Sequence, residues 1–123
     1  MNKLVKNIKK LLSKAVIKKL PKEIVLKEVS ERESRKFNQK YRGKNKPANV
    51  LSFCYSKDYG EILVCPSVIR KEAKKQGNTY KQQMTWMILH GMLHLGGLHH
   101  EFSAKARNRS EKIEKGILAR FFK

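Results

Sequence analysis

The feature that most constrains the fold is a long apolar segment that ends at a pair of glycines. From Thr79 onward the chain carries Trp86 and a series of Met, Leu and Ile residues at helical spacing. Gly96 and Gly97 follow directly, and glycine accepts the left-handed backbone that commonly ends a helix. The sequence therefore predicts a long helix that begins near Thr79 and stops at this glycine pair.

Shorter elements surround this helix. A first helix, apolar on one face and lysine-rich on the other, should run from the N-terminus to Pro21, and Ser30 with Glu33 is typical of a capping box. We expect strands at 23–29, 50–55 and 61–65, and helices at 30–41, 66–76 and 103–122. The predicted fold is one α+β domain over residues 1–123, with a small mixed sheet of about four strands packed with helices. Its metal site should lie at the end of the long helix.

The charge balance is strongly positive. The chain has 29 Lys and Arg against 10 Asp and Glu, a formal net charge of +19. Such a charge favours polyanionic partners, and binding to a nucleic acid should depend steeply on salt. Two alternatives stay open: a lysine-rich composition that serves solubility alone, or a first helix that lies on an anionic membrane surface. Packing of that helix on the core is the simpler interpretation.

The remaining composition is that of a cytoplasmic globular protein. At 40% hydrophobic and 32% charged residues, the chain can bury a core without disulfides. Cys54 and Cys65 do not form a CxxC pair and are expected to be reduced thiols. No run of 18 apolar residues is present, so we expect no membrane span.

The histidines indicate a metal site. His90 and His94 share one face of the predicted helix, so both imidazoles can reach one point. The glycine pair lets the chain turn back and bring His100 to the same ion, which we expect to be zinc, with nickel as another ion that fits these ligands. Three protein ligands leave a fourth position for water, as in catalytic sites. His99 is interpreted as a neighbour of the site, and a ligand role for it is the minority alternative.

The spacing of the histidines alone leaves the reaction open. Zinc-bound water attacks peptide and phosphodiester bonds alike, and the spacing equals that of the protease motif HExxHxxGxxH. In those proteases the glutamate after the first histidine is the general base, and here that position is Gly91. The missing base and the positive charge together favour a phosphate substrate.

Three sequence blocks resemble one known family. LHGMLHLGGLHH (89–100) resembles the motif HGxLHLxGxDH of the YbeY family, which are bacterial metallo-endoribonucleases. FNQKYRGKNKPANVLSF (37–53) is similar to that family's LNxxYRxxDxPTDVLSF, and YGEILVCPSVI (59–69) is similar to its LGDIxIC segment. This chain departs from the motifs at Pro47-Ala48-Asn49, at Glu61 and at His99.

The resemblance implies a single-strand-specific endoribonuclease that acts in maturation of the 3′ end of small-subunit rRNA and in ribosome quality control. It implies His90, His94 and His100 as ligands of one zinc ion, and RNA and the ribosome or ribosomal proteins as partners. The family's functional arginine matches Arg42, whose guanidinium would clamp phosphate oxygens. Ser52 is a weaker candidate for the pocket, as is the carboxylate of the third block. The alternatives are an RNA- or ribosome-binding factor with a non-catalytic metal, and a metal-dependent protease or other hydrolase.

Overall fold

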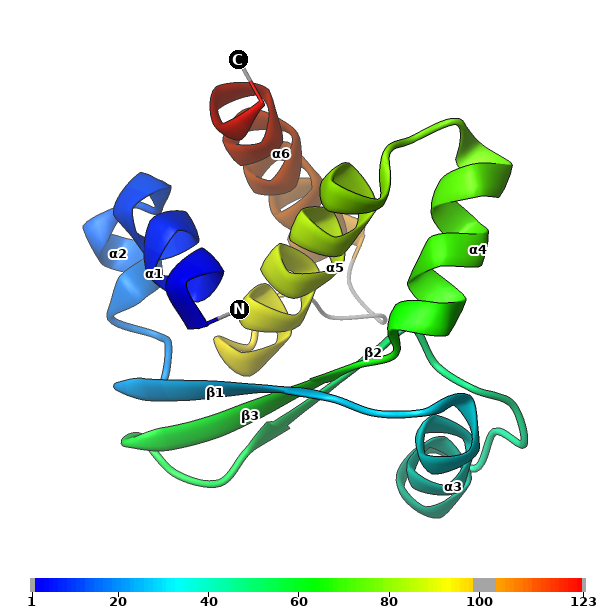
Figure 1. Cartoon of the computed structure of the whole chain (residues 1–123). Helices are drawn as coiled ribbons and strands as arrows, with labels where there is room; N and C mark the ends of the chain where they lie inside the picture. Colours follow the sequence, from blue (N-terminus) through cyan, green and yellow to red (C-terminus); the bar gives the residue numbers. More distant parts are fainter. Residues whose placement is uncertain (1, 99–103, 123) are drawn as a thin grey trace.

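The computed structural model describes residues 2–98 and 104–122, and a three-stranded mixed sheet forms its base (Figure 1). The strands are β1 (Glu23–Glu28), β2 (Val50–Cys54) and β3 (Tyr59–Val64), in the order β1-β3-β2. β2 and β3 form the expected antiparallel hairpin, whereas β1 pairs with β3 in parallel. The α+β class is confirmed, with three strands in the described residues where the sequence suggested about four.

The two faces of the sheet differ because successive side chains of a strand point to opposite sides. Val50, Ile62 and Val64 face the main hydrophobic core. Phe53 and Glu61, which pair across β2 and β3, line a pocket on the opposite face. The core-facing side of the sheet is therefore apolar, and the other side carries aromatic and charged groups.

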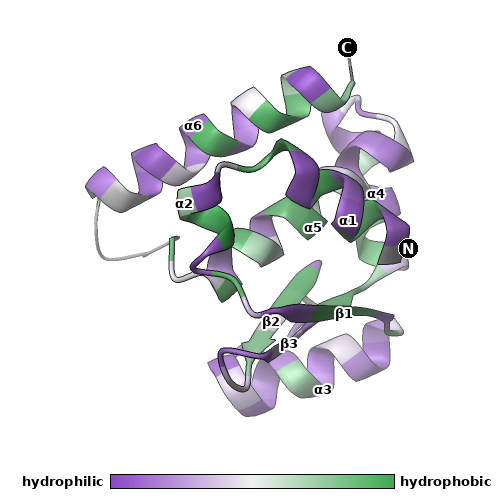
Figure 2. Ribbon diagram, turned by 90° about the vertical axis from the view of Figure 1, so that its left-hand side faces the viewer, coloured by the Kyte–Doolittle hydropathy of each residue, from purple (hydrophilic) through white to green (hydrophobic). Residues whose placement is uncertain are grey.

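The helices are divided unequally between these faces. Figure 1 shows α1, α4, α5 and α6 on one side of the sheet and α3 on the other. The helix bounds are α1 Asn2–Leu11, α2 Lys14–Ile17, α3 Glu31–Arg42, α4 Pro66–Gln76, α5 Tyr80–Leu95 and α6 Ala104–Phe121. Hydrophobic residues concentrate on α5 and the sheet, and hydrophilic residues on α3 and along α6 (Figure 2).

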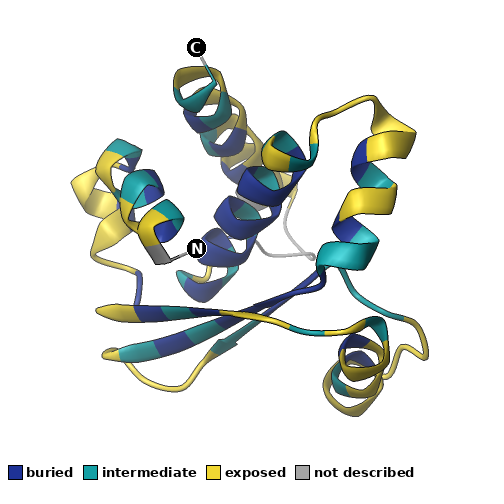
Figure 3. Ribbon diagram, viewed as in Figure 1, coloured by how far each residue is buried: buried dark blue, intermediate teal, exposed yellow. Residues whose placement is uncertain are grey.

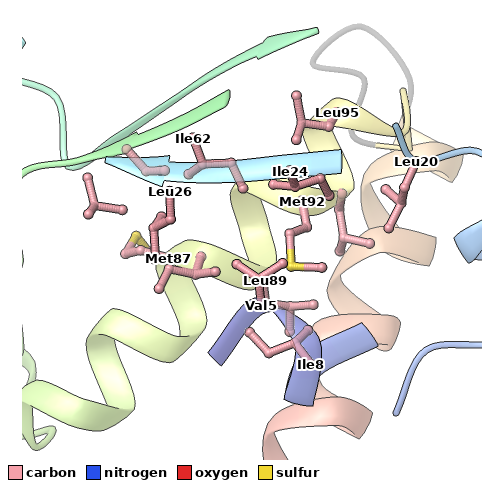
Figure 4. Close-up of a cluster of buried hydrophobic side chains, with 14 of the residues drawn as sticks. Val5, Ile8, Leu20, Ile24, Leu26, Ile62, Met87, Leu89, Met92 and Leu95 are labelled. Atoms are coloured by element: carbon pink, nitrogen blue, oxygen red, sulfur yellow. The ribbon is translucent and has the colours of Figure 1, made fainter. Parts of the chain in front are cut away.

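Helix α5 lies at the centre of the core. It contacts α1, α4, α6 and two strands, and most of its length is buried (Figure 3). Ile88, Leu89, Met92 and Leu93 have no exposed surface. Residues of α5 meet those of α1 and the sheet in one cluster (Figure 4). Each fully buried aliphatic side chain contributes about 1.5–3 kcal/mol to folding, so α5 organises the domain.

The expected helix ends are present. The Ser30 side chain accepts from the backbone of Glu33, whose carboxylate accepts from the Ser30 backbone, which confirms the capping box. Thr79 caps α5 in the same way through Gln82. Beyond α5 the backbone turns at Gly97, whose φ of 67° is left-handed. The predicted end of the long helix at the glycine pair is therefore confirmed.

The first helix is interrupted, and the prediction of one continuous helix to Pro21 is wrong. α1 ends at Leu11, and α2 begins after Ser13, whose side chain accepts from the backbone N–H of Val16. Serine favours this cap because its hydroxyl replaces a missing backbone partner. The apolar stripe of α1 packs on the core through Val5 and Ile8, as expected.

The two cysteines are reduced, as the sequence predicts. Cys54 is exposed and Cys65 is buried, and both are free thiols. Within the described ranges, no helix combines the length and apolar character that crossing a membrane requires.

Candidate metal centre

The two histidines of α5 face each other. The i, i+4 spacing places His90 and His94 one above the other, and their Nε2 atoms are 3.0 Å apart. The ring centroids are 4.6 Å apart, with the rings tilted by 71°. The pair lies on the face of α5 that also carries Trp86, and this face is partly exposed. The expected meeting of two imidazoles at one point is thus present.

A buried carboxylate holds the first of these histidines. Glu114 of α6 accepts a hydrogen bond from Nδ1 of His90 at 2.6 Å, and its side chain is 8% exposed. Its other oxygen accepts from the indole Nε1 of Trp86 at 3.2 Å. With its proton on Nδ1, a neutral His90 presents the Nε2 lone pair toward His94. A carboxylate in this position is the usual support of a metal-binding histidine.

Sequence reasoning missed Glu114. The residue lies on α6, 24 positions after His90, and only the packing of α6 against α5 brings the two together. A signal was nonetheless present. Ser110, Glu114 and Ile117 lie at helical spacing on the buried face of α6, and a glutamate at such a position needs a partner.

A cavity of about 530 Å³ opens beside His90 and Glu114. Trp86 and Met87 form its α5 side, and Lys115 lies on its α6 side. A partly open hollow beside a fixed imidazole leaves His90 accessible to a group that enters from solvent.

Gly91 faces the sheet, away from this cavity. A Cβ atom there would lie 3.0 Å from Ser52 Oγ and 3.1–3.2 Å from methyl groups of Val50 and Ile62. The Ser52 hydroxyl also donates to the Gly91 carbonyl at 2.9 Å. Glycine at the position of the protease glutamate is therefore explained by close helix–sheet packing. A longer side chain there would be directed into the sheet.

The structure brings together only part of the predicted site. His100 and His99 fall within 99–103, outside the described residues. Arg42 is the exposed last residue of α3, across the sheet from α5, and is not among the described residues that line the cavity. Ser52 contacts α5 through its hydroxyl, as described above.

Glu61 lies on the opposite face of the sheet from the histidine pair. Its carboxylate is 2.5 Å from Nζ of Lys27. This hydrogen bond, with others from Tyr55 and Tyr59, lowers the pKa of Glu61. The carboxylate of the third sequence block therefore belongs to a different pocket from that of His90.

The donor set of the pair fits a zinc ion. Two imidazole nitrogens bound to tetrahedral zinc at ~2.0–2.1 Å are about 3.3 Å apart, close to the distance between the two Nε2 atoms. Within residues 2–98 and 104–122, no group of three His, Cys, Asp or Glu side chains is placed to hold a metal. The described part of the chain thus brings together two candidate ligands and a carboxylate that holds one of them, His90.

Fold and site together define a class: a small α+β protein with a paired-histidine site on its central helix, supported by a carboxylate from the last helix. A family model described as Endoribonuclease YbeY matches residues 1–122. The chain therefore belongs to the YbeY endoribonuclease family, as the sequence motifs indicated.

Individual relatives agree. The Endoribonuclease YbeY of Thermotoga maritima is 37% identical over 119 residues, which cover 93% of this chain and 77% of that protein. The Endoribonuclease YbeY of Polynucleobacter asymbioticus is 38% identical over 122 residues, covering 90% and 78%. A solution structure of a Thermotoga maritima protein superposes with a TM-score of 0.61 at 31% identity, covering 95% of this chain and 80% of that one.

Proposed function

We propose that this protein is a metal-dependent endoribonuclease that cleaves single-stranded RNA in the cytoplasm. Its role would be maturation of the 3′ end of small-subunit rRNA and ribosome quality control, with the ribosome or ribosomal proteins as partners. The observation that carries the proposal is the His90–His94 pair, supported by Glu114, in a chain of the YbeY family. The net charge of +19 favours RNA over an uncharged substrate.

We assign His90, His94 and His100 as the ligands of one zinc ion, with nickel as the alternative. When bound, such an ion polarises a phosphoryl oxygen and lowers the pKa of a coordinated water. The chain's own contribution is orientation. Glu114 holds His90 through Nδ1, and Trp86 holds the Glu114 carboxylate in place. These hydrogen bonds therefore hold Nε2 of His90 toward Nε2 of His94, where the proposed ion would bind.

Arg42 is proposed to bind phosphate. Arg42 is an exposed residue at the end of α3, followed by Lys44 and Lys46 in a basic loop. A planar guanidinium binds two phosphate oxygens at once and stabilises charge that develops on them. Because Arg42 lies across the sheet from α5, we expect its loss to weaken RNA binding more than it slows bond cleavage.

The test compares cleavage of single-stranded RNA, double-stranded RNA and casein by the wild-type protein and His94→Ala. The matched control is Lys81→Ala, at the exposed start of the same helix. We expect the wild type and the control to cleave single-stranded RNA, and His94→Ala to lose that activity with its zinc content. RNA cleavage that persists in His94→Ala would refute the assignment. Casein cleavage lost in this variant would identify a protease, and RNA binding without cleavage a binding factor.

A further inference from the structure

A lysine groove lies at the opposite side of the domain core from α4. It is a hollow of about 680 Å³ between the end of the α1–α2 segment and the β2–β3 turn. Its charged lining consists of lysines: Lys9, Lys18, Lys19, Lys22 and Lys57. Five ammonium groups around one concavity repel one another, and the local potential strongly favours an anion.

The walls of the groove pack against the end of the histidine-bearing helix. A Cβ atom at Gly96, the residue after α5, would lie 3.0 Å from a methyl group of Leu20 and 3.5 Å from Cβ of Lys19. A Cβ atom at Gly60 would likewise lie 3.0 Å from the Pro21 ring and 3.2 Å from a methyl group of Leu95. The groove therefore adjoins the last turn of α5, which carries His94.

The groove lysines differ from lysines that are neutralised elsewhere. Lys27 and Lys71 each lie beside a glutamate, at 2.5 and 3.1 Å. Among the described residues of the groove, Lys22 forms an ion pair with Asp58, at 3.6 Å. Both side chains of this pair are mostly exposed, at 85% and 74%, so water screens it. The positive charge of the groove thus remains largely available to a ligand.

A membrane surface fits this groove less well than a nucleic-acid backbone. A helix that lies on a membrane inserts an apolar face into the lipid, but Val5, Ile8 and Leu12 of the first segment are buried in the core. Among the described residues that line the groove, the large aliphatic side chain that is exposed is Ile17, at 38%. One side chain offers little area for insertion, whereas a concave row of ammonium groups suits a chain of phosphates.

We propose that the lysine groove binds the phosphate backbone of single-stranded RNA on its way to the histidine pair. The inference rests on the proposed function, because it takes RNA as the substrate. It adds a second, sequence-independent contact that holds the strand at the end of α5. The groove would fix the position of the strand without reading its bases.

The experiment measures binding and cleavage separately. Fluorescence anisotropy with a short labelled single-stranded RNA, read in the cold, gives the affinity between about 50 and 200 mM salt. A gel of the same samples verifies that the RNA is intact, and longer warm incubation reports cleavage. The variant is Lys18→Ala/Lys57→Ala, and the control is Lys74→Ala/Lys75→Ala on α4, which removes the same charge from exposed positions.

We expect the groove variant to bind RNA about tenfold more weakly at low salt. The negative slope of log association constant against log salt concentration should become shallower by about 1.4. The control should change both by much less. The proposal would be overturned if both variants lost the same RNA affinity or if the groove variant bound RNA like the wild type. A wild type that does not bind RNA would also overturn it. Loss of binding to phosphatidylglycerol vesicles with RNA affinity intact would identify a membrane surface instead. A wild type that binds RNA through the groove without cleaving it would refute the nuclease activity alone.

Discussion

Substitution Glu114→Gln should weaken zinc binding while the fold is retained. The change preserves the size of a side chain that is 8% exposed but removes its charge. Its 2.6 Å bond from His90 then becomes a neutral one, about half as strong, and the amide can also turn its NH₂ group toward the imidazole. Loss of such a support costs about 10- to 100-fold in metal affinity, or about 1.4–2.7 kcal/mol.

The assay is a competition titration of metal-free protein with zinc and a chelator. Trp86 is the only tryptophan of the chain, and its indole donates to Glu114, so its fluorescence reports on this site. The matched control is Glu111→Gln, an exposed residue of α6 that lines the same cavity. Thermal unfolding without zinc measures how far each change affects the fold itself.

We expect Glu111→Gln to bind zinc like the wild type. If Glu114→Gln also did so, within about twofold, the carboxylate would not orient His90 and the reasoning would be refuted. If the free energy of unfolding without zinc fell by as much as the free energy of zinc binding, Glu114 would be assigned to packing alone.

Three further changes test the fold. Gly91→Ala should lower the free energy of unfolding in urea by about 1–2 kcal/mol, because overpacking against the sheet exceeds the gain in helix propensity; equal or higher stability would contradict the close packing. The hydrogen bond from Lys27 lowers the pKa of Glu61. The ionised pair therefore stabilises the fold fully above the ordinary glutamate pKa. This contribution is lost as the pH falls through the lowered pKa. Glu61→Gln should therefore lose more stability at about pH 7 than at about pH 3, a difference that urea unfolding at both values measures. Ser30→Ala should cost about 1 kcal/mol by removing the α3 cap, and an unchanged thermal midpoint would count against that cap.

Local features were predictable from the sequence. The capping residues, the glycine that ends α5 and the facing of His90 and His94 depend on neighbours within a few positions, so their pattern is visible in the chain. The interruption after Leu11 was missed, although Ser13 is a good capping residue, because the apolar spacing continues through it.

Features that depend on tertiary packing were not predictable in the same way. The parallel pairing of β1 with β3 is a choice of partner that no local pattern specifies. Glu114 reaches His90 only because α6 crosses α5, and an acidic residue in a buried stripe was the one available signal. The roles of His90, His94, His100 and Arg42 stay predictions.

The contact of Gly91 with the sheet has a consequence for redesign. An engineer who wished to convert this scaffold into a zinc protease would first install the glutamate of the HExxH motif at position 91. A Cβ atom at that position would already lie 3.0–3.2 Å from side-chain atoms of Ser52, Val50 and Ile62, so the helix would have to move away from the strands to admit a longer side chain. Such a movement would also displace the histidine pair. A general base for this scaffold would have to be introduced from another direction, and α6 already reaches the pair.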